Sequence, residues 1–227
     1  MLSAVLDRVI AYAARREPEL LAAREEWAER AGRVFDDDPL YEERTTAFLE
    51  WFALERPGTL DGDARRPGEA RPALPDEGRR EGRPPVDRFL AEEPLDDLEG
   101  RWAHALGRSH RSLFLVRELG KGHLALEDLL GGAHLEVTER RRLPGIAEGE
   151  VFEARVVANV VTPPELLFTR AFQFHPREAA PELKRISADA RERGLPRDEV
   201  LFRLLRARLR ALRYGHVPPG RIYAEER

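Results

Sequence analysis

The chain breaks into five short β-rich runs between about Ser112 and Phe174, and this feature constrains the fold most. Each run is rich in aliphatic, aromatic and β-branched residues, and turn signals containing glycine or proline separate one run from the next. The runs are SLFLVREL, GHLALEDLL, AHLEVTER, EVFEARVVANVV and LLFTRAFQFH, and the turns are GKG, GG, LPGIAEG and TPP. Short antiparallel strands joined by tight turns predict a small, strongly bent sheet or barrel, either SH3-like or OB-like.

Helical periodicity precedes these runs. From Leu2 onward, apolar residues recur at three- and four-residue intervals, which predicts an amphipathic first helix. Pro18 fits the first turn of a second helix, and the DDDP stretch, Asp36–Pro39, predicts the aspartate-capped start of a third. Capping is preferred over binding of a hard cation, because adjacent side chains diverge and no second acidic cluster completes a coordination sphere. Two short helices are predicted next, around Val86–Ala91 and Pro94–Leu106.

The most aromatic stretch, FLEWFALERP from Phe48 to Pro57, is interpreted as core. Its apolar side chains spread over more than a narrow stripe, which predicts a helix that is surrounded on most sides. A ligand site would need convergent polar groups, and the available ones, Glu50, Glu55 and Arg56, are spaced as an outward face. A groove for a partner is the alternative interpretation. The side chains expected inward are Tyr41, Phe48, Leu49, Trp51, Phe52 and Leu54.

The segment from Thr59 to Pro85 is predicted to be a linker or a long surface loop. It holds five prolines, four glycines and twelve charged residues, with Leu60 and Leu74 as its only large apolar side chains. Such a composition cannot bury enough apolar surface to order itself. Its arginines are interspersed with acids, which favours a solvated tether over a nucleic-acid arm.

The predicted fold class is therefore α+β. An N-terminal helical bundle is followed by a charged Pro/Gly-rich linker, a small five-stranded antiparallel barrel-like sheet and two C-terminal helices, near Glu178–Glu192 and Pro196–Arg213. The predicted boundaries are 1–57 for the helical bundle, 58–85 for the linker or surface loop, 86–175 for the helices that lead into the barrel, and 176–227 for the C-terminal helices and a tail containing VPPGR.

Composition argues against several protein classes. A formal net charge of −4 disfavours a surface built wholly for nucleic acid or anionic membrane. The absence of cysteine removes disulfides, thiolate nucleophiles and cysteine zinc sites. Asp7 and Arg8 interrupt the apolar start MLSAVLDRVIAYAARR, so no signal peptide is predicted. No run approaches the roughly 20 apolar residues of a membrane span. These observations predict a cytoplasmic protein with no membrane partner.

A search for catalytic and cofactor motifs identifies none. No serine lies in a Gly-x-Ser-x-Gly elbow, and the GKG at Gly120–Gly122 lacks the further glycines and the helix of a phosphate cradle. No histidine pair has helical metal-ligand spacing. His123 and His134 could share a barrel edge, although solvated strand positions are the preferred interpretation. The acidic run EEPLDDLEG, Glu92–Gly100, is interpreted as a partner of a helix dipole. No catalytic residue, metal or cofactor is assigned.

The order of several segments resembles a set of poorly characterised bacterial proteins. The segments are WFALER, PVDRFL and LFLVRE…G…LEDLLGGAHLEVTER…LPGIAEGEVFEARVV, within about Phe48 to Val157. Those proteins have a helical N-terminal part and a small β barrel, and some carry a C-terminal SEC-C zinc motif. This chain has no cysteine and therefore no such motif. The resemblance implies a fold and no catalytic residue.

The last predicted helix has the sharpest charge pattern. At 100° per residue, leucines centre one face and arginines gather on the opposite side. The leucines are Leu201, Leu204, Leu205, Leu209 and Leu212, and the arginines are Arg203, Arg206, Arg210 and Arg213. Arg208 falls within the leucine face and is predicted to be partly buried and paired, because a guanidinium there needs a partner. The other four arginines are predicted to be exposed.

These four arginines are the candidate residues for binding a partner or nucleic acid. Lys121 and Lys184 are the only lysines among 38 basic residues, a skew that GC-rich coding produces, so arginine content alone is weak evidence for phosphate binding. The net charge is +6 over Lys184–Arg213 and −5 over Met1–Arg56, so the two ends of the chain could face each other. A solvated or intramolecular role is preferred over a basic strip for nucleic acid or an acidic partner.

Three function classes remain open. The preferred hypothesis is a non-catalytic interaction or regulatory module that binds a protein partner, because the predicted fold offers surfaces and no reactive constellation. The alternative is a nucleic-acid-binding small barrel with an arginine-rich C-terminal helix. The strand phenylalanines disfavour this alternative, because they sit among aliphatic residues. A second alternative is an enzyme with an unrecognised site of histidines and carboxylates.

Overall fold

The computed structural model describes residues 1–57, 82–141 and 146–226 of the chain. Most of the predicted linker, 58–85, lies outside the described residues. Its last residues are described, and Pro85 begins a helix.

In the described part of the chain, five helices precede the barrel and share one buried apolar cluster. They are α1 (Leu2–Ala14), α2 (Glu17–Ala31), α3 (Tyr41–Leu54), α4 (Pro85–Glu92) and α5 (Asp97–Gly107). α1 packs against each of the other four. Pro18 lies in the first turn of α2, as predicted. Asp96 caps α5 and Glu99 completes a capping box, so this acidic run serves a helix start, as predicted.

Six strands of the described chain form one sheet that closes into a barrel. The strands are β1 (His110–Leu119), β2 (His123–Asp128), β3 (His134–Thr138), β4 (Val151–Ala158), β5 (Leu166–Phe168) and β6 (Gln173–Phe174). The first five pair in the order β1-β2-β3-β5-β4, pairing of β1 with β4 closes the ring, and β6 adds to β4. The predicted five-stranded barrel is confirmed, with the last β-rich run divided between β5 and β6.

One strand pairing differs from the antiparallel expectation. β3 and β5 run parallel, with Val137 opposite Leu166, whereas the other pairs are antiparallel. The sequence predicts either an SH3-like or an OB-like barrel. This strand order in a five-stranded ring matches the OB-like alternative. Phenylalanine and aliphatic side chains fill the interior, among them Phe114, Phe152 and Phe168. The strand phenylalanines are therefore core residues.

After the barrel, the described chain forms η1 (Arg177–Ala179), α6 (Ala180–Arg193), α7 (Arg197–Arg213) and α8 (Pro219–Ala224). α6 and α7 match the two predicted C-terminal helices. The predicted tail contains a further helix, α8, because VPPGR leads into a short helix whose Tyr223 is fully buried. These helices share a buried apolar cluster with Leu113 and Leu115 of β1. They therefore cover one side of the barrel.

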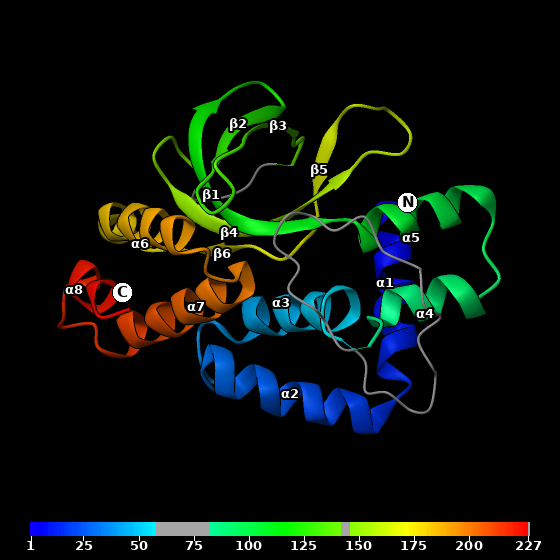
Figure 1. Cartoon of the computed structure of the whole chain (residues 1–227), viewed down its shortest axis with the longest axis horizontal. Helices are drawn as coiled ribbons and strands as arrows, with labels where there is room; N and C mark the ends of the chain where they lie inside the picture. Colours follow the sequence, from blue (N-terminus) through cyan, green and yellow to red (C-terminus); the bar gives the residue numbers. More distant parts are fainter. Residues whose placement is uncertain (58–81, 142–145, 227) are drawn as a thin grey trace.

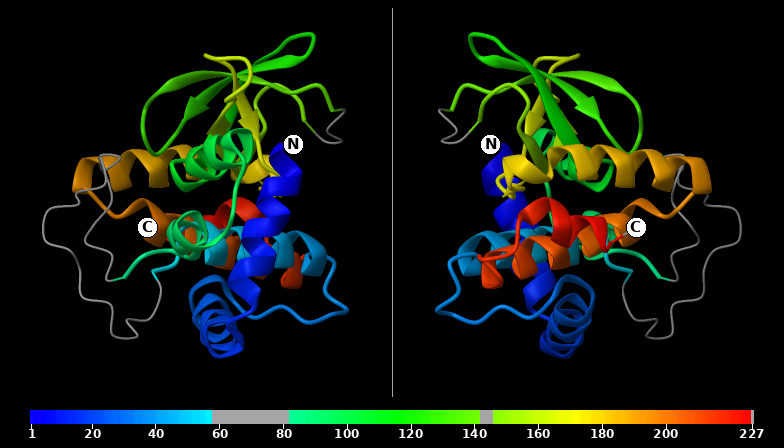
Figure 2. Two further views of the ribbon diagram at one scale, coloured as in Figure 1. Left: turned by 90° about the vertical axis from the view of Figure 1, so that its right-hand side faces the viewer. Right: turned by 90° about the vertical axis from the view of Figure 1, so that its left-hand side faces the viewer.

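The elements are arranged in layers. Figure 1 shows the barrel on one side of the molecule, with α6 next to it and α3 and α7 beneath. The two side views place α2 farthest from the barrel, with α3 and α7 between them (Figure 2). Helices from both ends of the chain therefore pack together on the same side of the barrel.

Aromatic packing joins α2, α3 and α7 and confirms the core interpretation of the FLEWFALERP stretch. Trp51 and Phe52 are buried. The ring centroid of Trp51 lies 5.2 Å from that of Trp27 and 5.6 Å from that of Phe202. Aromatic pairs at such separations stabilise a fold beyond the area that they bury. This cluster is the centre of the helical layer.

The DDDP stretch does not begin α3, contrary to the prediction. α3 starts at Tyr41, after an N-cap residue, Leu40, that makes no side-chain cap. Asp38 instead closes the preceding turn, because its carboxylate accepts hydrogen bonds from the Phe35 N–H at 2.8 Å and from Arg213 at 2.9 Å. Tyr41, which the sequence pattern places inward, is 38% exposed.

Candidate functional site

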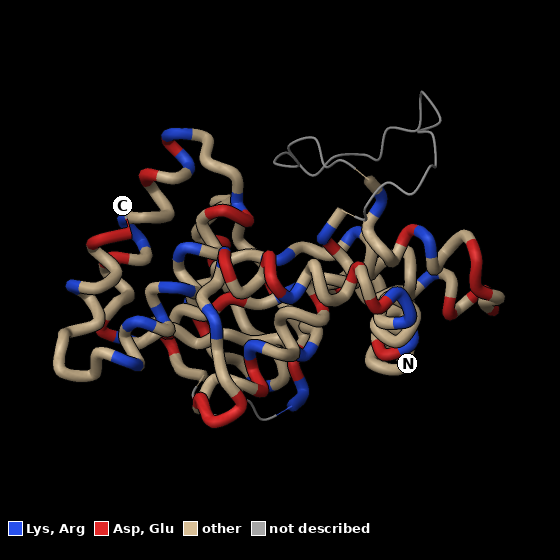
Figure 3. Tube along the Cα trace, turned by 90° about the horizontal axis from the view of Figure 1, so that it is seen from below, with Lys and Arg blue, Asp and Glu red and all other residues tan. Residues whose placement is uncertain are grey.

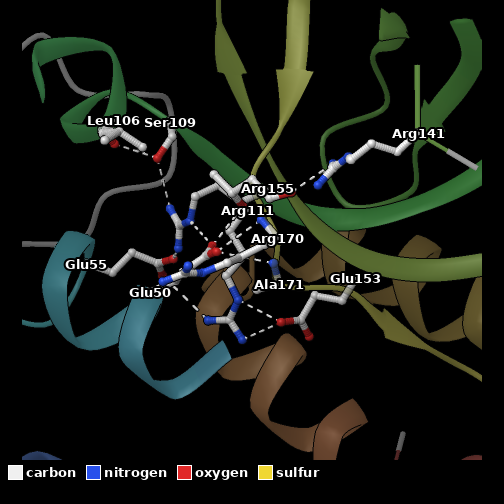
Figure 4. Close-up of polar contacts among 11 residues, drawn as sticks. Glu50, Glu55, Leu106, Ser109, Arg111, Arg141, Glu153, Arg155, Arg170 and Ala171 are labelled. Atoms are coloured by element: carbon white, nitrogen blue, oxygen red, sulfur yellow. Dashed lines mark hydrogen bonds and ion pairs between the residues drawn. The ribbon is translucent and has the colours of Figure 1, made fainter. Parts of the chain in front are cut away.

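Glu50 is buried against the barrel, although the sequence pattern places it on an outward face of α3. It is 1% exposed. Its carboxylate accepts hydrogen bonds from the Thr169 hydroxyl at 2.7 Å and from the backbone N–H groups of Arg170 and Ala171 at 3.2 and 3.1 Å. Figure 4 shows Glu50 with Arg170 and Ala171. The three hydrogen bonds fix the segment between β5 and β6 to α3. The prediction of an outward face is wrong because the barrel covers this side of the helix.

Two arginines of the barrel and three glutamates surround this contact and form what we call the buried charge cluster (Figure 4). Its members are Glu50, Glu55, Arg111, Glu153 and Arg155. Arg155 lies 3.5 Å from Glu50 and pairs with Glu55, and Arg111 lies 2.6 Å from Glu153. Burial lowers the pKa of Arg155 to about 10. Removing one partner from such a cluster leaves a buried charge uncompensated, so the cluster holds α3 in one position on the barrel.

A small cavity adjoins the buried charge cluster. Its volume is about 10 Å³, and its walls include Ala47, Glu50, Arg111, Glu153 and Arg155. That volume holds about one water molecule, whereas ligand pockets measure roughly 300–1,000 Å³. These charged groups therefore position secondary-structure elements, and a metabolite does not fit among them.

Further buried charges join α3 to α7. Arg208 is 8% exposed and donates hydrogen bonds to Gln173 Oε1 at 2.8 Å and to Glu43 Oε2 at 2.7 Å. This contact confirms the prediction that Arg208 is paired. Arg44 is fully buried and donates to the backbone oxygen of Leu205. Burial, together with the neighbouring Arg208, lowers the pKa of Arg44 to about 10.

Asp128 organises a polar cluster at the end of β2. Its carboxylate accepts hydrogen bonds from the Ser112 hydroxyl, from the Gly131 N–H at 2.9 Å and from His110 Nε2 at 2.8 Å. Burial alone would raise the pKa of Asp128, but these hydrogen bonds lower it to about 2. Ser112 and His110 both bond to the carboxylate, and the serine hydroxyl makes no hydrogen bond to the imidazole. The cluster therefore lacks the nucleophile-to-base contact that activates a serine.

The histidines of β2 and β3 do not share one barrel edge, contrary to that hypothesis. His123 lies opposite Thr138, and His134 lies opposite Glu127, so the two rings are at opposite ends of the β2–β3 ladder. Because this register separates them by the length of the ladder, the two imidazoles cannot act together at one site. His134 is exposed, as the preferred interpretation of a solvated strand histidine predicts.

His175, at the end of the barrel, is the most deeply buried histidine of the described residues. It is 3% exposed, and its Nδ1 lies 2.7 Å from the Tyr223 hydroxyl. Burial, together with Arg208 and Arg44, holds the pKa of His175 well below its ordinary value. A neutral ring bonded to Tyr223 docks α8 onto the barrel.

The four candidate arginines of α7 have different surroundings. Arg203 pairs with Glu199 of the same helix, Arg210 with Glu225 and Glu226 beyond α8, and Arg213 with Asp38. Arg206 and Arg213 are exposed, and Arg203 and Arg210 are half-buried. Among the residues that the structure describes, Arg206 alone of the four has no ion-pair partner. The expected contact between the acidic and basic ends of the chain is present, because Arg213 reaches Asp38 and Arg208 reaches Glu43.

Exposed apolar side chains lie where α7 ends beside the loop between α2 and α3. They are Phe35, 55% exposed, Tyr41, 38% exposed, Leu212, 43% exposed, and Tyr214, 51% exposed, and together we call them the α7-end patch. Arg213 ties the two segments together, because it donates to the Arg33 carbonyl at 2.8 Å and to Asp38 at 2.9 Å. The sequence pattern places Leu212 and Tyr41 inward and does not single out Phe35 and Tyr214. Only the tertiary contacts reveal the patch.

Comparison with protein-family models, with curated proteins and with solved structures finds no match to this chain. Within the described ranges, no three or more histidines and carboxylates are grouped so that they could hold a metal ion. None of the described helices has the length and apolar character that crossing a membrane requires.

Proposed function

We propose that this chain is a non-catalytic interaction module of the bacterial cytoplasm that binds a protein partner through the α7-end patch. The observation that carries the proposal is the exposure of Phe35 and Tyr214, each more than half accessible. Aromatic side chains are enriched in the centres of protein–protein interfaces. A group of them at the surface of a fold with a filled core supports the proposal of an interaction site.

The backbone beneath the patch is held in place, which favours binding. Arg213 joins the α2–α3 loop to the end of α7. The Asp38 carboxylate accepts hydrogen bonds from both Arg213 and the Phe35 N–H. One turn earlier, Arg208 joins α7 to Glu43 of α3. A surface that is already ordered loses little conformational entropy when a partner binds, so more of the contact energy appears as affinity.

The nucleic-acid alternative has less support. OB-like barrels bind oligonucleotides on the face of strands 2 and 3, and here that face presents Glu127 and Glu136. The phenylalanines that could stack on bases fill the barrel interior instead. Three of the four α7 arginines pair with acids of the same chain. Basic and acidic residues are interspersed along the chain in the view from below (Figure 3).

The enzyme alternative also has less support. Among the described residues, His110 hydrogen-bonds to the Asp128 carboxylate, and Ser112 bonds to that carboxylate rather than to the imidazole. The cavity beside Glu50 has room for about one water molecule. The first arrangement lacks a contact between nucleophile and base, and the second is too small for a substrate.

Affinity capture from the source cell tests the proposal. The tagged full chain is incubated with lysate and treated with nuclease, and the bound proteins are identified by mass. Wild type and two variants are compared, Phe35→Asp in the patch and Val161→Asp, an exposed apolar residue between β4 and β5 that serves as the matched control. We expect a protein that wild type and the control retain and that Phe35→Asp loses, because a carboxylate in an interface core is desolvated without a partner.

Two results would overturn the proposal. One is capture of the same protein by Phe35→Asp and by wild type, with both variants melting at the wild-type temperature. The other is recovery that nuclease abolishes and that rising salt weakens steeply, which is the behaviour of a nucleic-acid ligand.

A further inference from the structure

The charges beside the α7-end patch are separated by sign along α7. Arg206 lies at one end, next to Gly32, where a Cβ on the glycine would be 3.7 Å from Arg206 Cγ. Arg213 lies seven residues further on, next to Asp38, and a helix rises about 10 Å over that distance. The acids Asp36 and Asp37 immediately precede Asp38 in the loop. The surface therefore has a basic end and an acidic end.

These end charges are free to bind outside the chain. Arg206, Asp36 and Asp37 are all exposed. Within residues 1–57, 82–141 and 146–226, none of the three has an ion-pair partner. By contrast, Arg213 and Asp38 neutralise each other at 2.9 Å and contribute little to recognition. Arg33, which follows Gly32, is also exposed and has no ion-pair partner within the same described ranges. Arg206 and Arg33 thus give the surface two unpaired cations, and Asp36 and Asp37 give it two unpaired anions.

We propose that the partner of the α7-end patch is a second copy of this chain, related by a twofold axis. The inference rests on the proposed function and specifies its partner. In a twofold interface the same surface meets itself, so a patch with one sign of charge would repel its copy. A patch with a basic end and an acidic end is self-complementary, because the twofold brings Arg206 of each copy to Asp36 and Asp37 of the other. The exposed aromatic residues then pack against their counterparts.

Sedimentation equilibrium of the full chain over a range of concentrations tests the inference. We expect a reversible monomer–dimer equilibrium. Phe35→Asp should raise the dimer Kd by roughly tenfold or more, and the control Lys121→Asp, in the turn between β1 and β2, should leave it unchanged. Raising the salt concentration should weaken the dimer modestly, because the ion pairs lie at the rim.

Charge reversal in trans is the sharper arm of the test. Arg206→Asp with Arg33→Asp makes both ends of the surface acidic, and Asp36→Arg with Asp37→Arg makes both ends basic. Each variant alone should dimerise roughly tenfold or more weakly, because like charges then face each other. An equimolar mixture of the two should form a heterodimer, because opposite charges meet at both contacts. Adding Phe35→Asp to both variants should abolish this heterodimer.

The outcomes separate this inference from the proposed function. A chain that stays monomeric at every concentration overturns the second-copy inference, as does a dimer that neither Phe35→Asp nor the charge reversals weaken. If the chain is monomeric and Phe35→Asp still loses a different protein from lysate, the proposed function stands and the inference fails. If the chain dimerises, and the patch variants weaken neither the dimer nor the capture of a protein from lysate, both the inference and the proposed function fail.

Discussion

Glu50 is the residue on which the contact between α3 and the barrel depends most. Its carboxylate receives three hydrogen bonds from the Thr169–Ala171 segment and faces Arg155 at 3.5 Å. Both charged groups are almost completely buried. A carboxylate in this position is stabilised only by the full set of donors around it.

Glu50→Ala should therefore lower the free energy of unfolding by about 3–5 kcal/mol, because it leaves the Thr169 hydroxyl and two backbone N–H groups without their acceptor and removes one of the two carboxylates that face the buried Arg155. Urea denaturation measures the change. Glu42→Ala, in the exposed first turn of the same helix, serves as the control and should cost less than about 1 kcal/mol. Equal stability of the two variants would show that the buried charge cluster does not hold α3 in place.

Asp128 gives the fold a defined acid sensitivity. Its folded-state pKa of about 2 lies below the ordinary value of an aspartate, so the ionised carboxylate stabilises the folded state by about 2 kcal/mol. That contribution is complete above a pH of about 4 and is lost as the pH falls through about 2. The stability gap between wild type and Asp128→Asn should therefore be narrower at pH 3 than at pH 7, by about 1 kcal/mol. Urea titrations at both pH values measure the gap, and an unchanged gap would contradict this assignment.

Residue-level prediction succeeds where a charge interrupts an apolar stripe. Arg208 lies among leucines, so its need for a partner is visible in the helical pattern, and Glu43 and Gln173 provide it. Glu50 lies on a polar stripe, and such a stripe has the same pattern whether it faces water or a second polar layer. Its partner Thr169 is 119 residues away in the sequence, so only the fold identifies the contact.

At the scale of elements, α3 is the helix that joins α2 and α7 to the barrel. Its aromatic side chains contact α2 and α7, and its polar side contacts the barrel. Trp51→Ala should lower the free energy of unfolding by about 3–5 kcal/mol, which is typical of emptying a large aromatic site in a core. Thermal melts measure the change, with the exposed Tyr41→Ala as the matched control. A Trp51→Ala chain that is as stable as wild type and loses a bound protein would mean that Trp51 belongs to an interface.

Periodicity predicted the longer elements and failed at their ends. The helices, the barrel and its five principal strands follow from alternating and helical apolar spacing together with glycine and proline turn signals. The start of α3 was misplaced because Asp38 bonds to Phe35 and Arg213 rather than to a helix N-terminus. α8 was missed because its six residues are too few for a periodic pattern, and its burial depends on the contact of Tyr223 with His175.

At the scale of the whole molecule, the two ends of the chain meet on one side of the barrel. Arg208 reaches Glu43 at 2.7 Å, and Arg213 reaches Asp38 at 2.9 Å, so bases of the C-terminal segment neutralise acids of the N-terminal segment. The charge asymmetry of the sequence therefore supports the fold more than it supports nucleic-acid binding. The same packing brings Phe35 beside the end of α7 and so creates the α7-end patch.

The patch itself could not be predicted from the sequence. Phe35 lies in a loop, and Tyr214 follows the last residue of α7, so neither belongs to a repeating pattern. Leu212 continues the leucine stripe of α7 beyond the point where neighbouring elements cover the helix. Its side chain is therefore 43% exposed. Interaction surfaces of this kind depend on which segments the fold brings together, and spacing along one element does not report them.

Site-specific photocrosslinking tests most directly whether the α7-end patch is a protein interface. A photoreactive phenylalanine derivative replaces Phe35 in the full chain and, in a separate sample, replaces Val161, which lies at the barrel and is somewhat more accessible to solvent. Both samples are irradiated in lysate of the source cell and then treated with nuclease. The account predicts a discrete crosslinked protein from position 35, resistant to nuclease, and none from position 161. The same adducts from both positions, or an adduct from position 35 that nuclease removes, would contradict it.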